Sequence, residues 1–198
     1  MSTFGVVVAY YGDEKWRTLA NRAGNSAYNA GASEVVLMNG KNLAESRNTG
    51  ALHLSTDYIT FLDADDELHA MYFSALATYV EPDKKHLYKP QTLGAHPDGT
   101  YDKEPAFIRS GTSLYKSNSL VIGTTMRLSD FHETTGFDPE LEALEDWDLF
   151  LRLHRDGAEI IECTGMIYIV SVGLGGRNSD KEKHNKAFRQ IRRKYSFA

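Results

Sequence analysis

The sequence contains a single cysteine, Cys163, which excludes an intramolecular disulfide and any zinc site built from several cysteines. It has no apolar run of 18 residues, so we expect no transmembrane segment, and its N-terminus lacks the charged-then-apolar pattern of a signal peptide. Positive charge is not in excess, because the net charge is −5. This balance argues against a nucleic-acid partner. Together these absences predict a cytoplasmic protein.

The chain has 198 residues, of which 41% are hydrophobic and 25% charged, as in an ordinary globular protein. We find no repeat, no low-complexity tract and no linker between two domains, so we expect one domain over residues 1–178. Residues 179–198 form a basic tail with a helical apolar face that includes Phe188 and Ile191. We expect this helix to dock on the domain or to self-associate into a homo-oligomer, rather than to insert into a membrane, because its apolar face is short.

The first 40 residues predict a strand, a helix and a second strand. Phe4 to Tyr10 is a continuous apolar run, which is typical of a central parallel strand covered on both faces. Asp13 can cap a helix that runs to about Ala30, and residues 34–38 form the next strand. This order is a βαβ unit, and it indicates an α/β fold with an open sheet flanked by helices.

The rest of the chain continues the alternation less regularly. The periodicities predict helices over 43–54, 67–80 and 144–154, a short helix from Ser129, strands over 57–62, 86–91, 113–115, 120–126, 158–163 and 166–172, and a loop over 92–104.

Three carboxylates, Asp63, Asp65 and Asp66, follow the strand over 57–62 directly. Ligands of open α/β sheets bind at the carboxyl ends of the strands, and clustered carboxylates suit Mg²⁺ or Mn²⁺. The alternative is an acidic helix N-terminus, in which Asp65 or Asp66 caps the helix predicted over 67–80. The local sequence leaves both readings open.

Three blocks of the sequence, in this order, resemble the inverting family 2 glycosyltransferases of the GT-A fold. Residues 46–50 (SRNTG) are similar to the family's Ala-Arg-Asn-x-Gly helix, and residues 61–66 (FLDADD) to its Asp-x-Asp segment. Residues 135–141 (TGFDPEL) and 145–149 (EDWDL) are similar to its Gly-Phe-Asp turn and Glu-Asp-Trp helix. The resemblance covers roughly residues 4–172 and implies a GT-A fold.

The resemblance also implies a division of roles among the carboxylates. Asp65 is expected to bind the divalent ion, Mn²⁺ or Mg²⁺, while Asp63 and the adjacent Ala64 contact the ribose or the sugar. Asp146 is the expected general base, and Glu145 beside it is expected to raise its basicity or to hold the acceptor. For Asp66 we favour a helix cap over a metal ligand. A solvated acidic face is the alternative for the carboxylates of residues 140–148.

Arg47 is expected to contact the base or the diphosphate, and a surface arginine is the alternative. Ala9, Tyr10, Tyr11 and Asn39 lie at the ends of the first two strands, where a nucleobase would bind, although core packing explains either tyrosine equally well.

Two residues near the C-terminus complete the expected site. Arg177, among several glycines, is expected to close over the diphosphate, and His184 is the candidate for a histidine metal ligand. A solvated side chain is the simpler reading of His184, because it lies in a lysine-rich stretch. Asn39 is the one candidate for reading the base, so the nucleotide itself is left open.

These features predict an enzyme that moves a sugar from a nucleotide-diphosphate sugar, preferably a UDP-sugar, to an acceptor hydroxyl with inversion. The acceptor can be a glycan, a lipid-linked glycan or a protein side chain. One alternative is a nucleotidyltransferase of similar fold, against which stands the lack of a Gly-rich phosphate loop with a lysine near the first strand. The other alternative is a non-catalytic module that binds sugar nucleotides or glycans.

Overall fold

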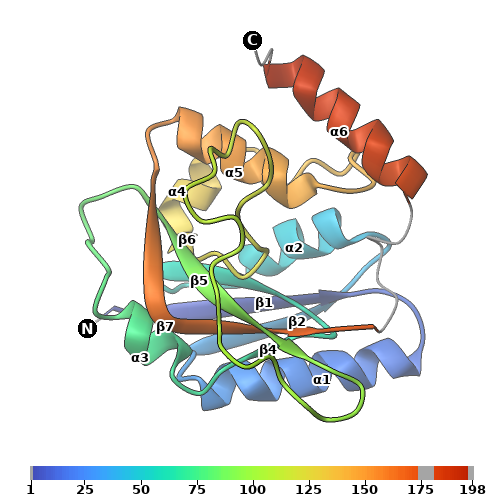
Figure 1. Ribbon diagram of the computed structural model, residues 1–198, viewed down its shortest axis with the longest axis vertical. Coiled ribbons are helices and arrows are strands. Elements are labelled where there is room, and N and C mark those ends of the chain that lie inside the picture. Colours follow the sequence, from blue (N-terminus) through green and yellow to red (C-terminus); the bar gives the residue numbers. More distant parts are fainter. Residues whose placement is uncertain (1, 174–180, 196–198) are drawn as a thin grey trace.

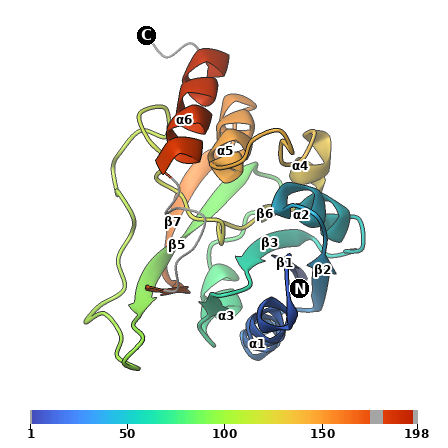
Figure 2. The same ribbon diagram turned by 90° about the vertical axis from the view of Figure 1, so that its right-hand side faces the viewer.

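The computed structural model describes residues 2–173 and 181–195. Its first sheet has the strand order β2-β1-β3-β6, in which β1 (Phe4–Tyr10) pairs in parallel with β2 (Glu34–Asn39) and β3 (Tyr58–Asp63). The short β6 (Met126–Arg127) is antiparallel at the edge. This sheet lies between the helices α1 (Glu14–Asn29) and α2 (Leu43–Ala51), one on each face (Figure 2). The predicted α/β fold with an open central sheet flanked by helices is therefore confirmed.

The βαβ unit forms where the sequence predicts it, because its signals are local. Asp13 caps α1 by accepting a hydrogen bond from the backbone N–H of Lys15, and Asn42 caps α2 by accepting from that of Glu45 at 2.8 Å. Gly50 lets α2 approach the sheet closely, since a Cβ there would lie 2.5 Å from Cγ1 of Val7.

A second sheet has the order β4-β7-β5 and crosses beside the first (Figure 1). Its strands are β4 (Glu67–Leu68), β5 (His86–Ala95) and β7 (Glu159–Ser171). The two strands predicted over 158–163 and 166–172 are one strand, and a register shift lets residues 164–166 bulge between them. β5 also runs on to Ala95, into the segment predicted as a loop.

The helix predicted over 67–80 is wrong in its first part. Glu67 and Leu68 form β4, which pairs antiparallel with Ile169 and Tyr168 of β7, and only α3 (Tyr72–Leu76) is helical. Pairing with a strand about a hundred positions away overrides the helical spacing of the apolar residues.

The strands predicted over 113–115 and 120–126 are also wrong, since apart from Thr125, which forms a bridge with Tyr88, and Met126 of β6 these segments form turns and irregular structure. Apolar side chains such as Leu114 and Leu120 are buried there without joining a sheet. The prediction failed because these apolar side chains are buried although their backbones do not pair with a neighbouring strand.

The C-terminal half adds three helices, α4 (Leu128–Glu133), α5 (Glu145–Arg155) and α6 (Lys181–Tyr195). α6 lies against α5 in both views (Figures 1 and 2). Its Ala187 and Ile191 are buried, and Tyr195 donates a hydrogen bond to Oδ1 of the buried Asp148 at 2.8 Å. The helix thus docks on the domain, one of the two arrangements predicted; its self-association stays a prediction. No helix among the described residues is long and apolar enough to cross a membrane.

Candidate active site

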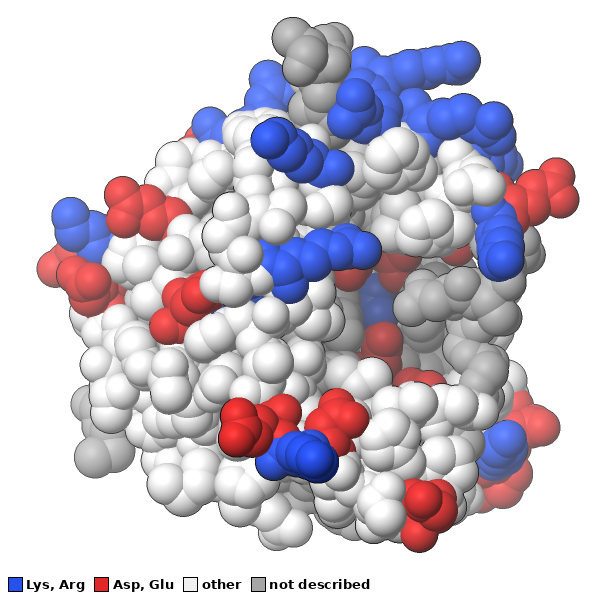
Figure 3. All heavy atoms as spheres, in the orientation of Figure 1, with Lys and Arg blue, Asp and Glu red and all other residues white. Residues whose placement is uncertain are grey.

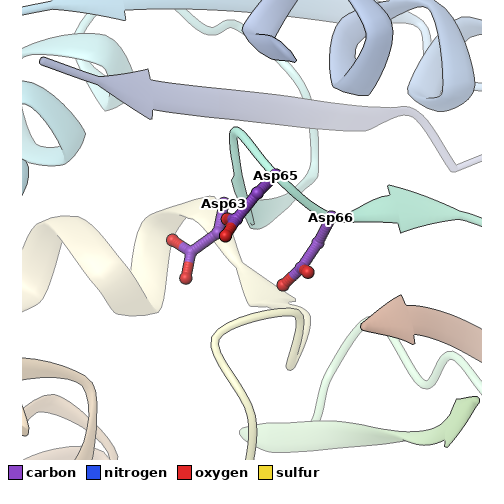
Figure 4. Close-up of side chains that lie close together, drawn as sticks. All are labelled: Asp63, Asp65 and Asp66. Carbon is purple, nitrogen blue, oxygen red and sulfur yellow. The ribbon is translucent and has the colours of Figure 1, made fainter. Parts of the chain in front are cut away.

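The three carboxylates at the end of β3 converge. Asp63 is the last residue of β3, and the turn to β4 brings Asp65 and Asp66 beside it, with the backbone N–H of Asp66 donating to the carbonyl of Asp63 at 3.1 Å. Their carboxylate oxygens lie within 4.8 Å of one another (Figure 4). Three oxygen ligands at this spacing fit one divalent cation of the size of Mg²⁺ or Mn²⁺.

Asp66 is not a helix cap, so the capping reading of the cluster is wrong. Its carboxylate accepts hydrogen bonds from the Tyr168 hydroxyl and from the backbone N–H of Ser171, each at 2.8 Å, and these contacts hold β4 to β7. Burial, followed by the charge of Asp63, raises the pKa of Asp66 to about 8. A bound cation would offset both effects, so the electrostatics of the cluster also fit a metal ion.

Arg47 connects the motifs of the sequence. Its buried guanidinium donates to Oδ1 of Asp63 and to Oε1 of Glu145, each at 2.6 Å, and stacks 5.2 Å from the ring centroid of Phe137. One side chain of α2 therefore fixes the Asp-x-Asp turn relative to the first residue of α5. A surface position for Arg47 is excluded.

The Gly-Phe-Asp turn is held by the residue next to Arg47. The side-chain amide of Asn48 donates to the carbonyl of Phe137 at 2.9 Å and accepts from its N–H at 2.8 Å. Gly136 has a positive φ of 73°, and a Cβ on it would collide with Oδ1 of Asn48. This turn and α2 are therefore locked together, and glycine is the residue that fits there.

Asp146 lies in the first turn of α5, and each of its two carboxylate oxygens accepts a hydrogen bond. Oδ1 accepts from the backbone N–H of Trp147 at 2.8 Å, and Oδ2 accepts from the side-chain amide of Asn118 at 3.0 Å. Burial raises the pKa of Asp146 to about 6, and the charge of Glu145 adds to this effect. A carboxylate that is ionised at neutral pH yet more basic than usual suits a general base.

These groups border one cavity of about 400 Å³. Its walls include Arg47, Asp63, Asp66, Glu145, Asp146 and His184, together with Ile108, Arg109, Asn118, Leu120, Val121, Ile122, Ala143, Leu144, Tyr168 and Val170. Figure 3 shows the hollow, with acidic side chains inside it. The structure thus brings together the predicted base, its acidic neighbour, Arg47, Asp63 and the candidate histidine.

Other predicted residues lie outside the cavity wall. Ala9, Tyr10, Tyr11 and Asn39 are at the carboxyl ends of β1 and β2, with Tyr10 paired to Asn39 and Ala9 to Asp63 in the sheet register. Tyr11 and Asn39 are exposed, whereas Ala9 is buried.

The remaining predicted residues lie close to the acidic turn or beyond the described chain. Ala64 is buried in the turn between Asp63 and Asp65. Asp65 belongs to the carboxylate cluster, and its backbone carbonyl accepts from Arg22 at 3.0 Å and from the Ser171 hydroxyl. Arg177 lies outside the described residues.

Arg109 and Asn118 also line the cavity, and no motif in the sequence points to them. Both belong to the irregular segment between β5 and β6, in which only residues 113–115 and 120–126 were predicted as strands. Only the folded chain shows that this segment reaches Asp146.

The family model for Glycosyl transferase family 2 matches residues 19–139. This match covers more than half of the chain, so the protein belongs to that family, as the motifs predict. A search of curated proteins finds no match.

The fold is similar to crystal structures of TarS from S. aureus. The complex of TarS 1–349 with UDP-GlcNAc matches with a TM-score of 0.69 at 14% identity over 96% of this chain, and the complex with UDP matches with 0.67 at 12% identity over 96%. A further TarS structure matches with 0.65 at 14% identity, again over 96%. These matches confirm the GT-A fold. The chain spans 65% and 64% of the two TarS 1–349 complexes and 39% of the third structure.

Proposed function

We propose that the protein transfers a sugar from a UDP-sugar to an acceptor hydroxyl, with inversion at the transferred carbon. The observation that carries this proposal is the single cavity that contains both an acidic cluster suited to a metal-bound diphosphate and a separate, oriented carboxylate, Asp146. A leaving group and an attacking hydroxyl need these two environments on opposite sides of the reacting carbon. The TarS complexes with UDP-GlcNAc and UDP support the choice of a uridine nucleotide.

The donor side of the site is formed by the ends of β1, β2 and β3. In our proposal Ala9, Tyr10, Tyr11 and Asn39 bind the nucleotide, because the sheet register places them beside Asp63 at the carboxyl edge. Ala64 lets the turn backbone approach the sugar. Arg47 acts on the donor indirectly, since its guanidinium already binds Asp63 and Glu145.

Asp63, Asp65 and Asp66 would hold Mn²⁺ or Mg²⁺, with His184 of α6 as a candidate further ligand because it lines the same cavity. When bound, the ion supplies positive charge to the diphosphate leaving group. Arg47 holds the carboxylate of Asp63 in place by a hydrogen bond, and the Tyr168 hydroxyl does the same for Asp66.

Asp146 takes the proton from the acceptor hydroxyl as that oxygen attacks the sugar carbon. Asn118 and the N–H of Trp147 fix the carboxylate without neutralising it, and the nearby charge of Glu145 raises its basicity. Glu145 itself is bound to Arg47, so we assign it the role of an orienting charge. We also propose that the protein acts in the cytoplasm.

A release assay separates this function from its alternatives. The protein is incubated with UDP-sugars or with nucleoside triphosphates, with Mn²⁺ or with a chelator, and free UDP and pyrophosphate are measured. Metal-dependent release of UDP from a UDP-sugar is expected, with water taking the sugar when no acceptor is supplied. Release of pyrophosphate from a triphosphate would show a nucleotidyltransferase, and binding of UDP-sugar with no release of UDP, even when sugars are added as acceptors, would show a binding module.

A further inference from the structure

Backbone strain is concentrated at the cavity. Among the described residues, the non-glycine positions with positive φ are Arg109 at 47° and Leu144 at 59°, and both line the cavity that contains Asp146. The left-handed region is unfavourable for a non-glycine residue, and such outliers gather at functional sites. Leu144 directly precedes α5, whereas Arg109 lies in a turn of the irregular segment between β5 and β6.

The backbone around Arg109 is held by contacts outside its own side chain. The Ser110 hydroxyl donates to Glu162 at 2.9 Å, and Glu162 is paired with Lys89 at 2.8 Å. The N–H of Thr112 donates to the carbonyl of Arg109 at 3.1 Å. Glycine would adopt this conformation without strain, so the folding of the turn does not call for an arginine.

The charge of Arg109 has no counter-ion among the described residues. Its guanidinium donates to the backbone carbonyl of Asn118 at 2.8 Å and makes no ion pair with any carboxylate of the described chain. The other arginine of the cavity wall, Arg47, is paired twice. Arg109 is exposed at the wall and has N–H donors to spare for a ligand.

Asn118 places Arg109 on the acceptor side of the cavity. The backbone carbonyl of Asn118 binds Arg109, and its side-chain amide binds Oδ2 of Asp146 at 3.0 Å. The acceptor hydroxyl has to reach Asp146, so a group near that hydroxyl comes within reach of the guanidinium. The donor diphosphate is expected at the other side, beside the aspartate cluster.

The surface next to the cavity, formed by α6, carries positively charged side chains, as Arg109 does. α6 carries seven basic side chains, and its His184 lines the cavity, which connects the basic helix to the site. Figure 3 shows basic side chains gathered over α6 and at the rim of the hollow. Three of these side chains pair with carboxylates, Lys183 and Lys186 with Glu142 and Lys194 with Asp148, and the other basic side chains of α6 favour the approach of an anionic substrate.

We propose that the acceptor carries a negatively charged group, a phosphate or a carboxylate, close to the hydroxyl that is glycosylated, and that Arg109 binds this group. The inference rests on the proposed function and adds the chemical class of its acceptor. Arg109 is a specificity-determining residue in this account, and a planar guanidinium suits bidentate binding of either anion.

The test measures binding of matched probes to the protein saturated with UDP and Mg²⁺, which is diamagnetic. The pairs are glucose with glucose 6-phosphate and methyl glucoside with methyl glucuronide, titrated by NMR at low salt. We expect each anionic member to bind at least about tenfold more tightly than its neutral partner, the scale of one charge-assisted contact. Arg109→Gln and Arg109→Gly should lower this ratio to nearly one, and Arg109→Lys should keep part of it.

Lys84→Gln is the matched control, since it removes one exposed positive charge away from the cavity and should leave the ratio unchanged. Equal binding of the two members by the wild-type protein, including no measurable binding of either, would overturn the inference. So would a tenfold preference that survives Arg109→Gln. UDP binding, measured on the same samples, separates the two proposals: its absence in the wild-type protein would contradict the proposed function instead.

Discussion

Arg47 and Glu145 lie 98 positions apart in the chain, and their side chains form a buried ion pair with Nη1 and Oε1 2.6 Å apart. The same guanidinium binds Asp63. Arg47 thus binds both Glu145, the first residue of α5, and Asp63, the last residue of β3. The relative positions of the two halves of the site depend on it.

Arg47→Met should destabilise the fold strongly. It removes the guanidinium that pairs with the buried carboxylate of Glu145, and removing one member of a buried pair costs about 3–5 kcal/mol. Chemical denaturation measures the free energy of unfolding. Arg17→Met is the control, because Arg17 and Glu14 form an exposed pair whose loss should change stability by less than about 1 kcal/mol. Equal effects of the two substitutions would show that the buried pair does not organise the site.

Gly136→Ala should destabilise the fold through a steric collision, in addition to the backbone strain of a positive φ. The new Cβ would meet Oδ1 of Asn48, so the Gly-Phe-Asp turn and α2 have to move apart. Gly99→Ala is the control: Gly99 also has a positive φ, of 84°, but a Cβ there has no neighbour within 4 Å. We expect a loss of about 1 kcal/mol for Gly99→Ala and at least about 2 kcal/mol more for Gly136→Ala, measured by denaturation. Similar losses would mean that the contact with Asn48 is not tight.

Asp65→Asn should weaken metal-dependent binding of UDP, because a neutral oxygen replaces a charged ligand. Calorimetry with UDP and Mn²⁺ measures this binding, and a chelator should abolish it in the wild-type protein. Asp83→Asn, at an exposed turn outside the cluster, is the control. Metal-dependent binding that is undiminished in Asp65→Asn would remove Asp65 from the site.

The transfer rate should fall as the pH drops through about 6. The pKa of Asp146 is raised to about 6, and only the ionised carboxylate can take a proton, so the active form exists above this pH and is lost below it. The measurement is kcat/KM for the acceptor between pH 4.5 and 8 at saturating donor. A rate that stays constant down to about pH 4.5 would contradict the assignment of Asp146 as the base.

The parts of the fold that the sequence predicts correctly are those with local signals. The apolar run of β1 and the capping residues Asp13 and Asn42 define their elements without help from distant residues. The helix predicted from Glu67 fails because its first residues pair with β7, an interaction between distant segments that the local periodicity does not contain.

The same distinction applies to the site. Asp63 and Asp146 are predicted because their motifs are contiguous in the sequence. Asp66 is misassigned as a helix cap, since its partners Tyr168 and Ser171 come from a strand about a hundred positions later. Arg109 belongs to an irregular segment and enters the site only through its contact with Asn118. Such residues follow from tertiary contacts alone.

The most direct test of the account is Asp146→Asn, measured for both donor binding and transfer. A group that acts only when the acceptor loses its proton affects the transition state and not the bound donor. The amide has nearly the shape of the carboxylate but keeps only one of the two acceptor oxygens, so a melting curve at pH 7.5 checks that the variant still folds. We predict nearly wild-type affinity for the UDP-sugar and transfer at least about a hundredfold slower. Near-normal transfer by Asp146→Asn, with transfer abolished in Glu145→Gln, would make Glu145 the base, and normal transfer by both variants would contradict the inverting mechanism.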